Sequence, residues 1–464
     1  MHHKKIFGNT NYILLILFLF ACKKMVDIGP PKTQLVSSSV FTSDATATAA
    51  ITGIYVQMTM DAGLNTFPSG SLSFFGGVAA DELNYLGNNT PYNEINSNSI
   101  TVTNGEIDNF WNSAYQYIYG ANAALEGLNG SSGLSDSVKK QLTGEALFIR
   151  AFSNFYLVNY FGDIPLVVST NYQISAVAAR SSTVLIYQQI TNDLVQAQTL
   201  LAHDYSYSEG ERVRPNYWAA TALLSRVYLY TGNWADAESL ATLVIDNSSD
   251  FILASDPTNV FEKNGSESIW QLLPVSPGYN YRVQDAIWFI PAADEVPNTA
   301  MTSELLNDFE SGDLRRTAWI DSTVIDTSIY YYPFKYKVKD QLNTTEYYTL
   351  LRLGEQYLIR SEARAQQNKP DEAIGDVNII RTRAGLPSLP MGLSQADCLT
   401  AIQQERRVEM FCECGQRWFD LQRTKTADEI LSTLKPSWKS TDILFPIPQT
   451  ERQKDPNLTQ NPGY

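Results

Sequence analysis

The side chains best suited to acid–base chemistry gather near the carboxyl end of the chain. The stretch 405–423, ERRVEMFCECGQRWFDLQR, places carboxylates and guanidinium groups a few positions apart. The residues concerned are Glu405, Arg406, Arg407, Glu409, Arg417 and Asp420. Hydrolysis of a glycosidic bond requires two positioned carboxylates, but opposite charges on helix ends more often form structural ion pairs. We therefore favour a structural role for this cluster.

Two thiols in the same stretch could indicate a metal site. Cys412 and Cys414 form a C-x-C pair, but residues two apart on a helix point to opposite sides. Apart from the N-terminal leader and Cys22, which are described below, only Cys398 and His203 offer further soft ligands. We interpret the cysteines as buried thiols and predict no metal site, while a disulfide from Cys398 stays open.

The motifs of other catalytic chemistries are missing from the sequence. It contains no G-x-S-x-G, no H-E-x-x-H and no glycine-rich phosphate loop. His203 is the only histidine beyond the leader, which removes most nucleophile–base pairs. We therefore predict a protein that is not an enzyme, with no catalytic residues and no cofactor. A glycan-degrading enzyme is the less favoured alternative.

Aromatic and amide side chains in two loop-rich regions offer a binding surface instead. Glycine, asparagine, serine and aromatic residues fill about 61–104, and prolines, glycines and aromatics recur over about 250–348. A ring face can cover the apolar C–H patches of a sugar, and an Asn amide can bind its hydroxyls. The same surface could hold a peptide, and any single ring could instead pack a loop onto the helices. The candidate ligand-binding residues are Asn84, Tyr85, Tyr92, Tyr281, Trp288, Trp319 and Tyr331.

A helical scaffold must position these loops, and its clearest unit is the stretch 214–249. Apolar residues at helical spacing predict two amphipathic helices with a break at Thr-Gly-Asn, 231–233. Ala237 and Ala241 let two backbones approach closely, while Tyr228 and Trp234 fill the space beside them. This order of large, small and aromatic positions is the tetratricopeptide pattern. Such a pair requires neighbours of the same kind.

Similar periodicity predicts further helices on both sides of this pair. The expected helices span about 44–60, 106–128, 136–161 and 183–201, a second pair over 349–387 that breaks near 368–370, and 394–413. Short β-prone runs lie at 268–273 and 329–338, and the tail 443–464 is expected to be extended. We thus expect a single, mainly α domain over 44–464, with helical repeats at about 106–249 and 349–423.

The N-terminus has the features of an export leader. Lys4 and Lys5 precede an apolar run, 12–20, that is too short to span a bilayer, which takes about 20 residues. Cys22 follows a small residue, in a pattern similar to a bacterial lipobox. We predict a signal peptide over 1–21, acylation of Cys22 and a polar tether over 22–43. A plain signal peptide with a chance cysteine is the alternative.

The net charge argues against one class of partner. The 464 residues carry a formal charge of −15, which repels nucleic acid and anionic lipid head groups. We therefore predict no nucleic-acid partner. Attachment to a membrane would have to come from the acylated Cys22 and not from charge.

Four stretches make the chain similar to a known protein family. They are 150–165 (RAFSNFYLVNYFGDIP), the pair at 214–249, 351–387 (LRLGEQYLIRSEA to RTRAGLP) and 405–423, and the closing LFPIPQTERQKDPNLTQNPGY agrees as well. Taken in order, they resemble the SusD/RagB family of outer-membrane nutrient-binding lipoproteins of Bacteroidota. The resemblance implies about four tetratricopeptide-like helix pairs that carry a loop-rich ligand region. It also implies a partner, a SusC-like TonB-dependent barrel.

The same resemblance implies a function. The protein is expected to be lipid-anchored in the outer membrane, facing the exterior, where it captures an oligosaccharide or polysaccharide and delivers it to the barrel. A peptide-binding member of the family is one alternative. A secreted tetratricopeptide scaffold for other proteins is another, although it explains neither the leader nor the aromatic loops.

Membrane attachment is expected to depend on Cys22. The variant Cys22→Ala should yield a folded protein in the soluble fraction, because the acidic body has no other affinity for the membrane. Cell fractionation in a strain that lacks the partner barrel provides the measurement. A variant that stays in the membrane fraction of that strain would show that the lipobox interpretation is wrong.

Overall fold

The computed structural model describes residues 40–60, 67–275, 282–339 and 344–464. The predictions for the signal peptide, for Cys22 and most of its tether, and for Tyr281 lie outside these residues. Within the described ranges, none of the helices combines the length and apolar character that crossing a membrane requires.

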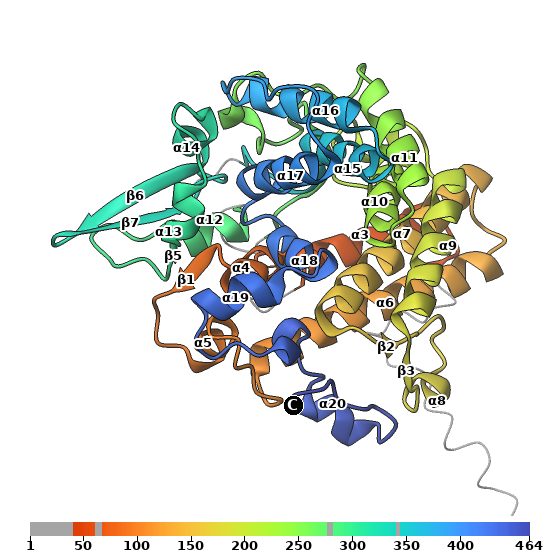
Figure 1. Cartoon of the computed structure of the whole chain (residues 1–464). Helices are drawn as coiled ribbons and strands as arrows, with labels where there is room; N and C mark the ends of the chain where they lie inside the picture. The colour runs from red at the N-terminus through yellow and green to blue at the C-terminus, as the bar shows by residue number, and fades with distance from the viewer. Residues whose placement is uncertain (1–39, 61–66, 276–281, 340–343) are drawn as a thin grey trace, which may run out of the picture.

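Helices packed side by side form most of the molecule (Figure 1). The longer ones are α3 (Asp44–Thr59), α6 (Gly105–Gly130), α7 (Asp136–Phe161), α9 (Thr183–Leu200), α10 (Tyr217–Tyr230), α11 (Trp234–Asp246), α15 (Leu353–Gln366), α16 (Pro370–Arg383) and α17 (Gln395–Glu409). From α6 to α17, each helix of this series packs against the next. The predicted mainly α fold with tetratricopeptide-like packing is therefore confirmed.

Helix ends lie where the sequence carries capping and stop signals. The side chain of Asn104 accepts hydrogen bonds from the amides of Glu106 and Ile107 at the start of α6. Helix α7 ends at Phe161 because Gly162 adopts a φ of 71° and Pro165 cannot continue a helix. Both predicted bounds of α7 are confirmed, and its end follows from these local signals.

Small residues join the opening pair to the next repeat. Ala237 and Ala241 of α11 are fully buried and pack with Ile359 and Ala363 of α15. Trp234, at the first position of α11, contacts this cluster but stays partly exposed. The predicted close approach of two helix backbones is confirmed for α11 and α15. The side chain of Trp234 fills the space beside them only in part.

Region 61–104 is not the run of loops that its composition predicted. It contains α4 (Ser71–Ala79), whose residues are all buried, and α5 (Thr90–Asn96). A Cβ at Gly76 would lie 2.3 Å from the Cα of Gly415, so a glycine is needed where α4 meets the turn before α18 (Gln416–Arg423). Tertiary packing thus overrides the low helix propensity of glycine.

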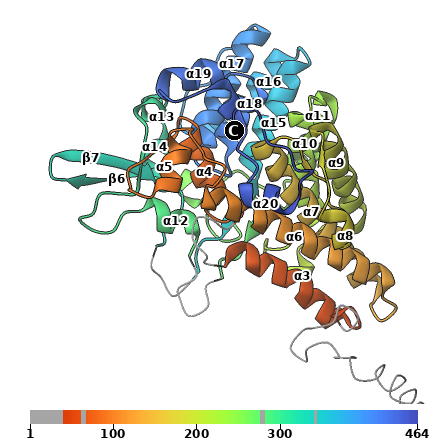
Figure 2. The ribbon, with the colours of Figure 1, turned by 90° about the horizontal axis from the view of Figure 1, so that it is seen from below.

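The strands form short antiparallel pairs that link distant parts of the chain. β1 (Leu83–Tyr85) pairs with β5 (Thr299–Met301), β2 (Ile164–Pro165) with β3 (Arg180–Ser181), β4 (Ser268–Leu272) with β8 (Tyr348–Arg352), and β6 (Ile320–Ile325) with β7 (Ser328–Pro333). The remaining helices are short: α8 (Tyr172–Ser175), α12 (Gln284–Phe289), α13 (Ser303–Asn307), α14 (Leu314–Trp319), α19 (Ala427–Leu434) and α20 (Gln449–Lys454). Hairpin β6–β7 projects from the side opposite α9 in both views (Figures 1 and 2).

Several predicted element bounds require correction. Residues 349–352 belong to strand β8 and not to a helix, because they pair with β4. Helix α17 ends at Glu409, four residues before the predicted end at Glu413. The tail contains helix α20 and is not wholly extended.

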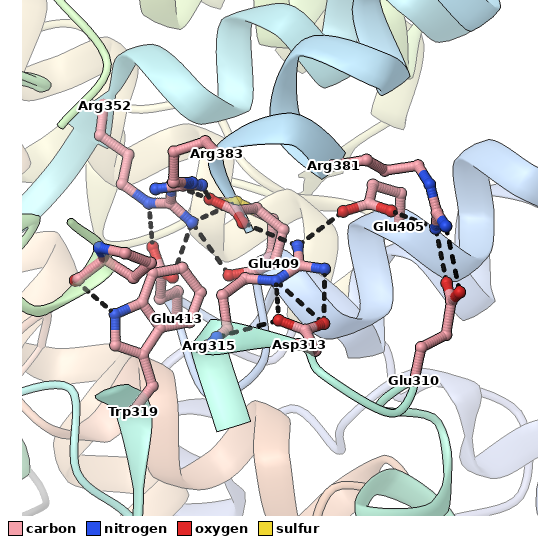
Figure 3. A network of polar contacts seen from close by, with 12 residues as sticks. Glu310, Asp313, Arg315, Trp319, Arg352, Arg381, Arg383, Glu405, Glu409 and Glu413 are labelled. Carbon is pink, nitrogen blue, oxygen red and sulfur yellow. Dashed lines mark hydrogen bonds and ion pairs between the residues drawn. The ribbon is translucent and has the colours of Figure 1, made fainter. Parts of the chain in front are cut away.

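Glu409, at the end of α17, lies at the centre of a buried network of charges (Figure 3). Its carboxylate accepts hydrogen bonds from Arg315 of α14 at 3.0 Å, from Arg352 of β8 at 2.6 Å, and from Arg383 of α16. The four side chains are at most 4% exposed. Burial alone would raise the pKa of Glu409, but the three guanidinium groups hold it below its ordinary value. The network therefore joins two helices and a strand to the carboxylate of α17.

Loss of the Glu409 charge should strongly destabilise the fold. Glu409→Gln should lower the free energy of unfolding by about 3–5 kcal/mol, because three buried guanidinium groups lose a shared partner. Chemical denaturation of the purified protein measures this change. Glu310→Gln is the matched control: Glu310 also pairs with an arginine, Arg381, but its side chain is 47% exposed, so its loss should cost about 0–1 kcal/mol. Equal costs for the two variants would contradict a central role for Glu409.

Candidate functional site

The carboxylates and arginines of 405–423 are engaged with one another or with neighbours in ion pairs. Arg406 binds Asp420 at 2.9 Å, and Arg417 binds Asp81 at 2.8 Å. Glu405 pairs with Arg315 at 2.6 Å. Five of the six residues of the cluster are buried, and Arg417 is partly exposed. The structural interpretation of this cluster is confirmed.

The three described cysteines are free and buried, which confirms their interpretation as buried thiols. The argument from helix geometry was wrong, however, because Cys412 and Cys414 lie in a turn with φ angles of 50° and 48°. Burial raises the pKa of Cys414 to about 12, so its thiol stays protonated and unreactive at neutral pH.

An aromatic cluster joins the two loop-rich regions. Tyr92 of α5 and Tyr85 of β1 pack against Phe74 of α4, with ring centroids 5.1 and 6.0 Å away. Trp288 of α12 joins from the second region, 6.3 Å from Phe74 and 6.0 Å from Tyr92. Three of the seven predicted ligand residues are thus brought together, although about 200 positions separate them in sequence.

Burial differs within this aromatic cluster. Phe74 is fully buried and Tyr92 is 7% exposed, whereas Tyr85 and Trp288 are only partly buried. The inner rings therefore support the outer two, which present aromatic surface to solvent. A supported and partly exposed ring can cover the apolar face of a ligand without first losing side-chain freedom.

The other predicted residues lie elsewhere. Asn84 points to the face of β1 opposite Tyr85, because side chains alternate along a strand. Tyr331 is partly buried under the guanidinium of Arg316, 5.7 Å from its ring centroid. Tyr281 lies outside the described residues.

Trp319 is not an exposed ring, contrary to the expectation for the second loop region. It is fully buried, and its indole N–H donates a hydrogen bond to the carbonyl of Pro257 at 2.7 Å. The ammonium of Lys335 lies 4.7 Å from its ring centroid. This ring packs against the buried charges of the core, so it cannot contact a ligand from solvent.

A buried lysine that the sequence did not single out holds the helices of the aromatic cluster. The ammonium of Lys435 donates to the carbonyl of Val78 in α4 and to that of Asn96 at the end of α5, both at 2.6 Å. A cation is favourable at a helix carboxyl terminus, and this one serves two helices at once. Burial lowers the pKa of Lys435 to about 8. Nothing in the local sequence distinguishes this lysine from an exposed one.

Asp285 is a buried acid on the helix that carries Trp288. It lies one turn earlier on α12, it is 4% exposed, and its Oδ1 has no hydrogen-bond partner among the described residues. Burial raises the pKa of Asp285 to about 8, and the negative charge of Glu413 also raises it. A hydrogen bond with Ser73 and the positive charge of Lys335 lower it, but by less. The carboxyl is therefore largely protonated at neutral pH.

The stability of the protein should fall as the pH rises toward 8. The pKa of Asp285 is raised from 3.8 to about 8 on folding. Its contribution to the free energy of unfolding is therefore full below its pKa in the unfolded chain, and it is lost as the pH rises through its pKa in the folded protein. Glu82, raised to about 7, acts in the same direction. The slope contributed by each carboxyl is at most about 1.4 kcal/mol per pH unit. Thermal melts from pH 5 to 9 measure it.

The variant Asp285→Asn should flatten this pH dependence, because an amide has no proton to lose. Asp294→Asn changes an exposed carboxyl of the same region and should parallel the wild type. If Asp285→Asn kept the full slope of the wild-type protein, Asp285 would not be the titrating group.

Comparisons with known proteins agree with this architecture. A family model described as starch-binding and associating with the outer membrane matches residues 36–229, and the SusD family model matches 307–435. SusD-like protein P2 of Formosa agariphila is 28% identical, over 98% of this chain and 99% of that protein.

Solved structures agree as well. The crystal structure of a SusD superfamily protein from Bacteroides vulgatus has a TM-score of 0.80 at 22% identity, covering 91% of this chain and 99% of that one. A laminarin-binding SusD-like protein has a TM-score of 0.78 at 25% identity, covering 90% and 99% of the two chains. With two matching family models, a relative of full length and the same fold, the chain belongs to the SusD/RagB family.

Proposed function

We propose that this protein binds a glycan at the aromatic cluster of Tyr85, Tyr92 and Trp288, and delivers it to a SusC-like TonB-dependent barrel. Acylated Cys22 would hold it at the outer membrane, on the exterior face. Membership of the family supports this function, as does the similarity to a protein described as laminarin binding. The family model described as associating with the outer membrane supports the location.

The observation that carries the proposal is the placement of Tyr85 and Trp288. They come from separate loop regions, yet both contact the ring cluster around Phe74 and both stay partly exposed. Two platforms on one ring cluster can each hold a sugar ring by its apolar face. Because these rings are held by buried neighbours, little conformational entropy is lost when a ligand binds.

Two other functions are less well supported by the site. A peptide could use the same rings, but no unpaired charge among the cluster residues would select its ends. An enzyme needs two carboxylates facing the ligand. Of the acids beside the cluster, Glu106 is partly exposed but hydrogen-bonded to Tyr92, whereas Glu82 and Asp285 are only 1% and 4% exposed and their pKa values are raised by burial.

Removing the exposed rings should weaken glycan binding while leaving the fold intact. Trp288→Ala and Tyr85→Ala should each reduce affinity by about 1–2 kcal/mol, or about 5- to 30-fold, because each ring covers part of the sugar. Melting temperatures should change little, since both rings are partly exposed. Isothermal titration calorimetry with laminarin and with starch, paired with thermal melts, provides the measurement.

Tyr119→Ala is the matched control, because this tyrosine of α6 is 56% exposed and lies outside the aromatic cluster. Its affinity should equal that of the wild type. If all three variants bound equally, the site would lie elsewhere. If the wild-type protein bound peptides and neither polysaccharide, the glycan proposal would fail, and shortening of the polysaccharide during incubation would favour the enzyme alternative.

A further inference from the structure

A second concave surface lies on the face of the molecule that is built from the last repeats. It is an open groove of about 990 Å³. Helices α15 and α17 form one wall, α13, α18 and α19 form the other, and the start of α11 closes one end. In Figure 1, α17 lies next to α15 and above α18 and α19. The groove contains no residue of the aromatic cluster described above.

Most of the charges that line this groove are already paired, while the carboxylate of Glu304 is exposed and makes no ion pair with the described residues. Asp81 accepts hydrogen bonds from Arg417 at 2.8 and 2.9 Å, and it also pairs with Arg407. Arg423 binds Glu362 at 2.8 Å. Burial alone would raise the pKa of Asp81, but the two guanidinium groups lower it to about 2, so the pairing persists across the physiological range. A strongly charged ligand would therefore find few unpaired charges in this groove.

Neutral amides line the walls. Gln404 donates its amide to the carbonyl of Asp308 at 2.9 Å, which leaves its oxygen free to accept. The side-chain amides of Gln366 and Asn307 have no hydrogen-bond partner in the part of the chain that the structure describes. Each free amide offers both donors and acceptors. This combination suits sugar hydroxyls, which also donate and accept.

Trp234 supplies an aromatic surface at one end of the groove. Its ring packs partly on the repeat interface and stays partly exposed. Its side chain lines the groove. The role that the sequence suggested, filling space within the repeat, accounts for only part of this side chain. The remainder faces the groove and its amides.

The groove continues toward β1. A hollow of about 390 Å³ shares Asp81, Glu304 and Leu434 with the groove, and adds Asn84 and Asn96. Asn84, which lies on the opposite face of β1 from Tyr85, thus belongs to this second surface. The whole path offers amides along its length and an aromatic ring at one end.

We infer that this path, from Trp234 to Asn84, is a second saccharide-binding groove that holds a neutral chain of several sugar units. The inference rests on the proposed glycan-binding function and adds a separate site with its own preference for long chains. The groove itself is lined mostly by helices, and the short strand β1 borders only the hollow at the far end of the path. The described residues of the groove therefore offer no long strand edge for the main-chain ladder that binds an extended peptide. Neutral amides, paired charges and one ring favour a sugar polymer.

The test begins by finding a glycan that the wild-type protein binds. Electrophoresis in gels that contain laminarin, starch, xylan or galactomannan identifies a polysaccharide that retards the protein. Oligosaccharides of that glycan then serve as calorimetric probes, short ones of about two or three units and long ones of about eight to ten. Trp234→Ala should bind the long probes about tenfold more weakly and the short probes unchanged. Trp288→Ala should weaken binding at every length.

Because Trp234 also contacts the repeat interface, a second variant is needed. The double variant Asn307→Ala with Gln403→Ala removes two groove amides that are exposed or partly exposed, so the core stays intact. It should show the same selective loss for long probes. Tyr172→Ala, at a tyrosine of α8 that is 73% exposed and outside both surfaces, should match the wild type.

Each outcome decides a different point. If both groove variants bind long probes as tightly as the wild type, the second groove is refuted and the proposed function stands. If the wild type is retarded in none of the gels, the proposed function fails, and this inference fails with it. If the groove variants instead lose affinity for neutral peptides, the groove holds a peptide and the saccharide assignment is overturned.

Discussion

One buried carboxylate, Glu409, depends on three guanidinium groups, and the packing of distant elements depends on that arrangement. Arg315, Arg352 and Arg383 reach it from α14, β8 and α16. A buried charge without its partners costs several kcal/mol, so none of these elements can shift without exposing or isolating a charge. The loop-rich region between α11 and α15 is thereby fixed to the repeats at the point where α14 meets them.

The same carboxyl-terminal stretch also holds the first loop region in place. Arg407 and Arg417, a few residues from Glu409, both bind Asp81, and the amide of Cys412 donates to Glu82 at 3.1 Å. Strand β1 begins directly after these two acids. The cluster that looked suited to acid–base chemistry therefore acts by positioning, because it sets the place of β1 and of the rings that follow.

Sequence reasoning succeeded where the signals are local and failed where they are not. The end of α7 could be predicted because Gly162 and Pro165 stop the helix within four residues. Helix α4 could not, since Gly76 is selected by contact with Gly415, more than 300 positions away. The membrane leader remains a prediction, because it lies outside the described residues.

The two tryptophans of the second loop region show the same limit at the proposed site. Trp288 and Trp319 both lie in short helices, α12 and α14. Trp319 is nevertheless sealed by the carbonyl of Pro257 and the ammonium of Lys335, while Trp288 rests on Phe74 and keeps part of its ring in solvent. A ring serves as a platform only when neighbours support it without covering it, and those neighbours come from other elements. Strand β1 likewise places two neighbouring residues in different surroundings. Its alternation sends Tyr85 to the aromatic cluster and Asn84 to the groove, so adjacent residues belong to different surfaces.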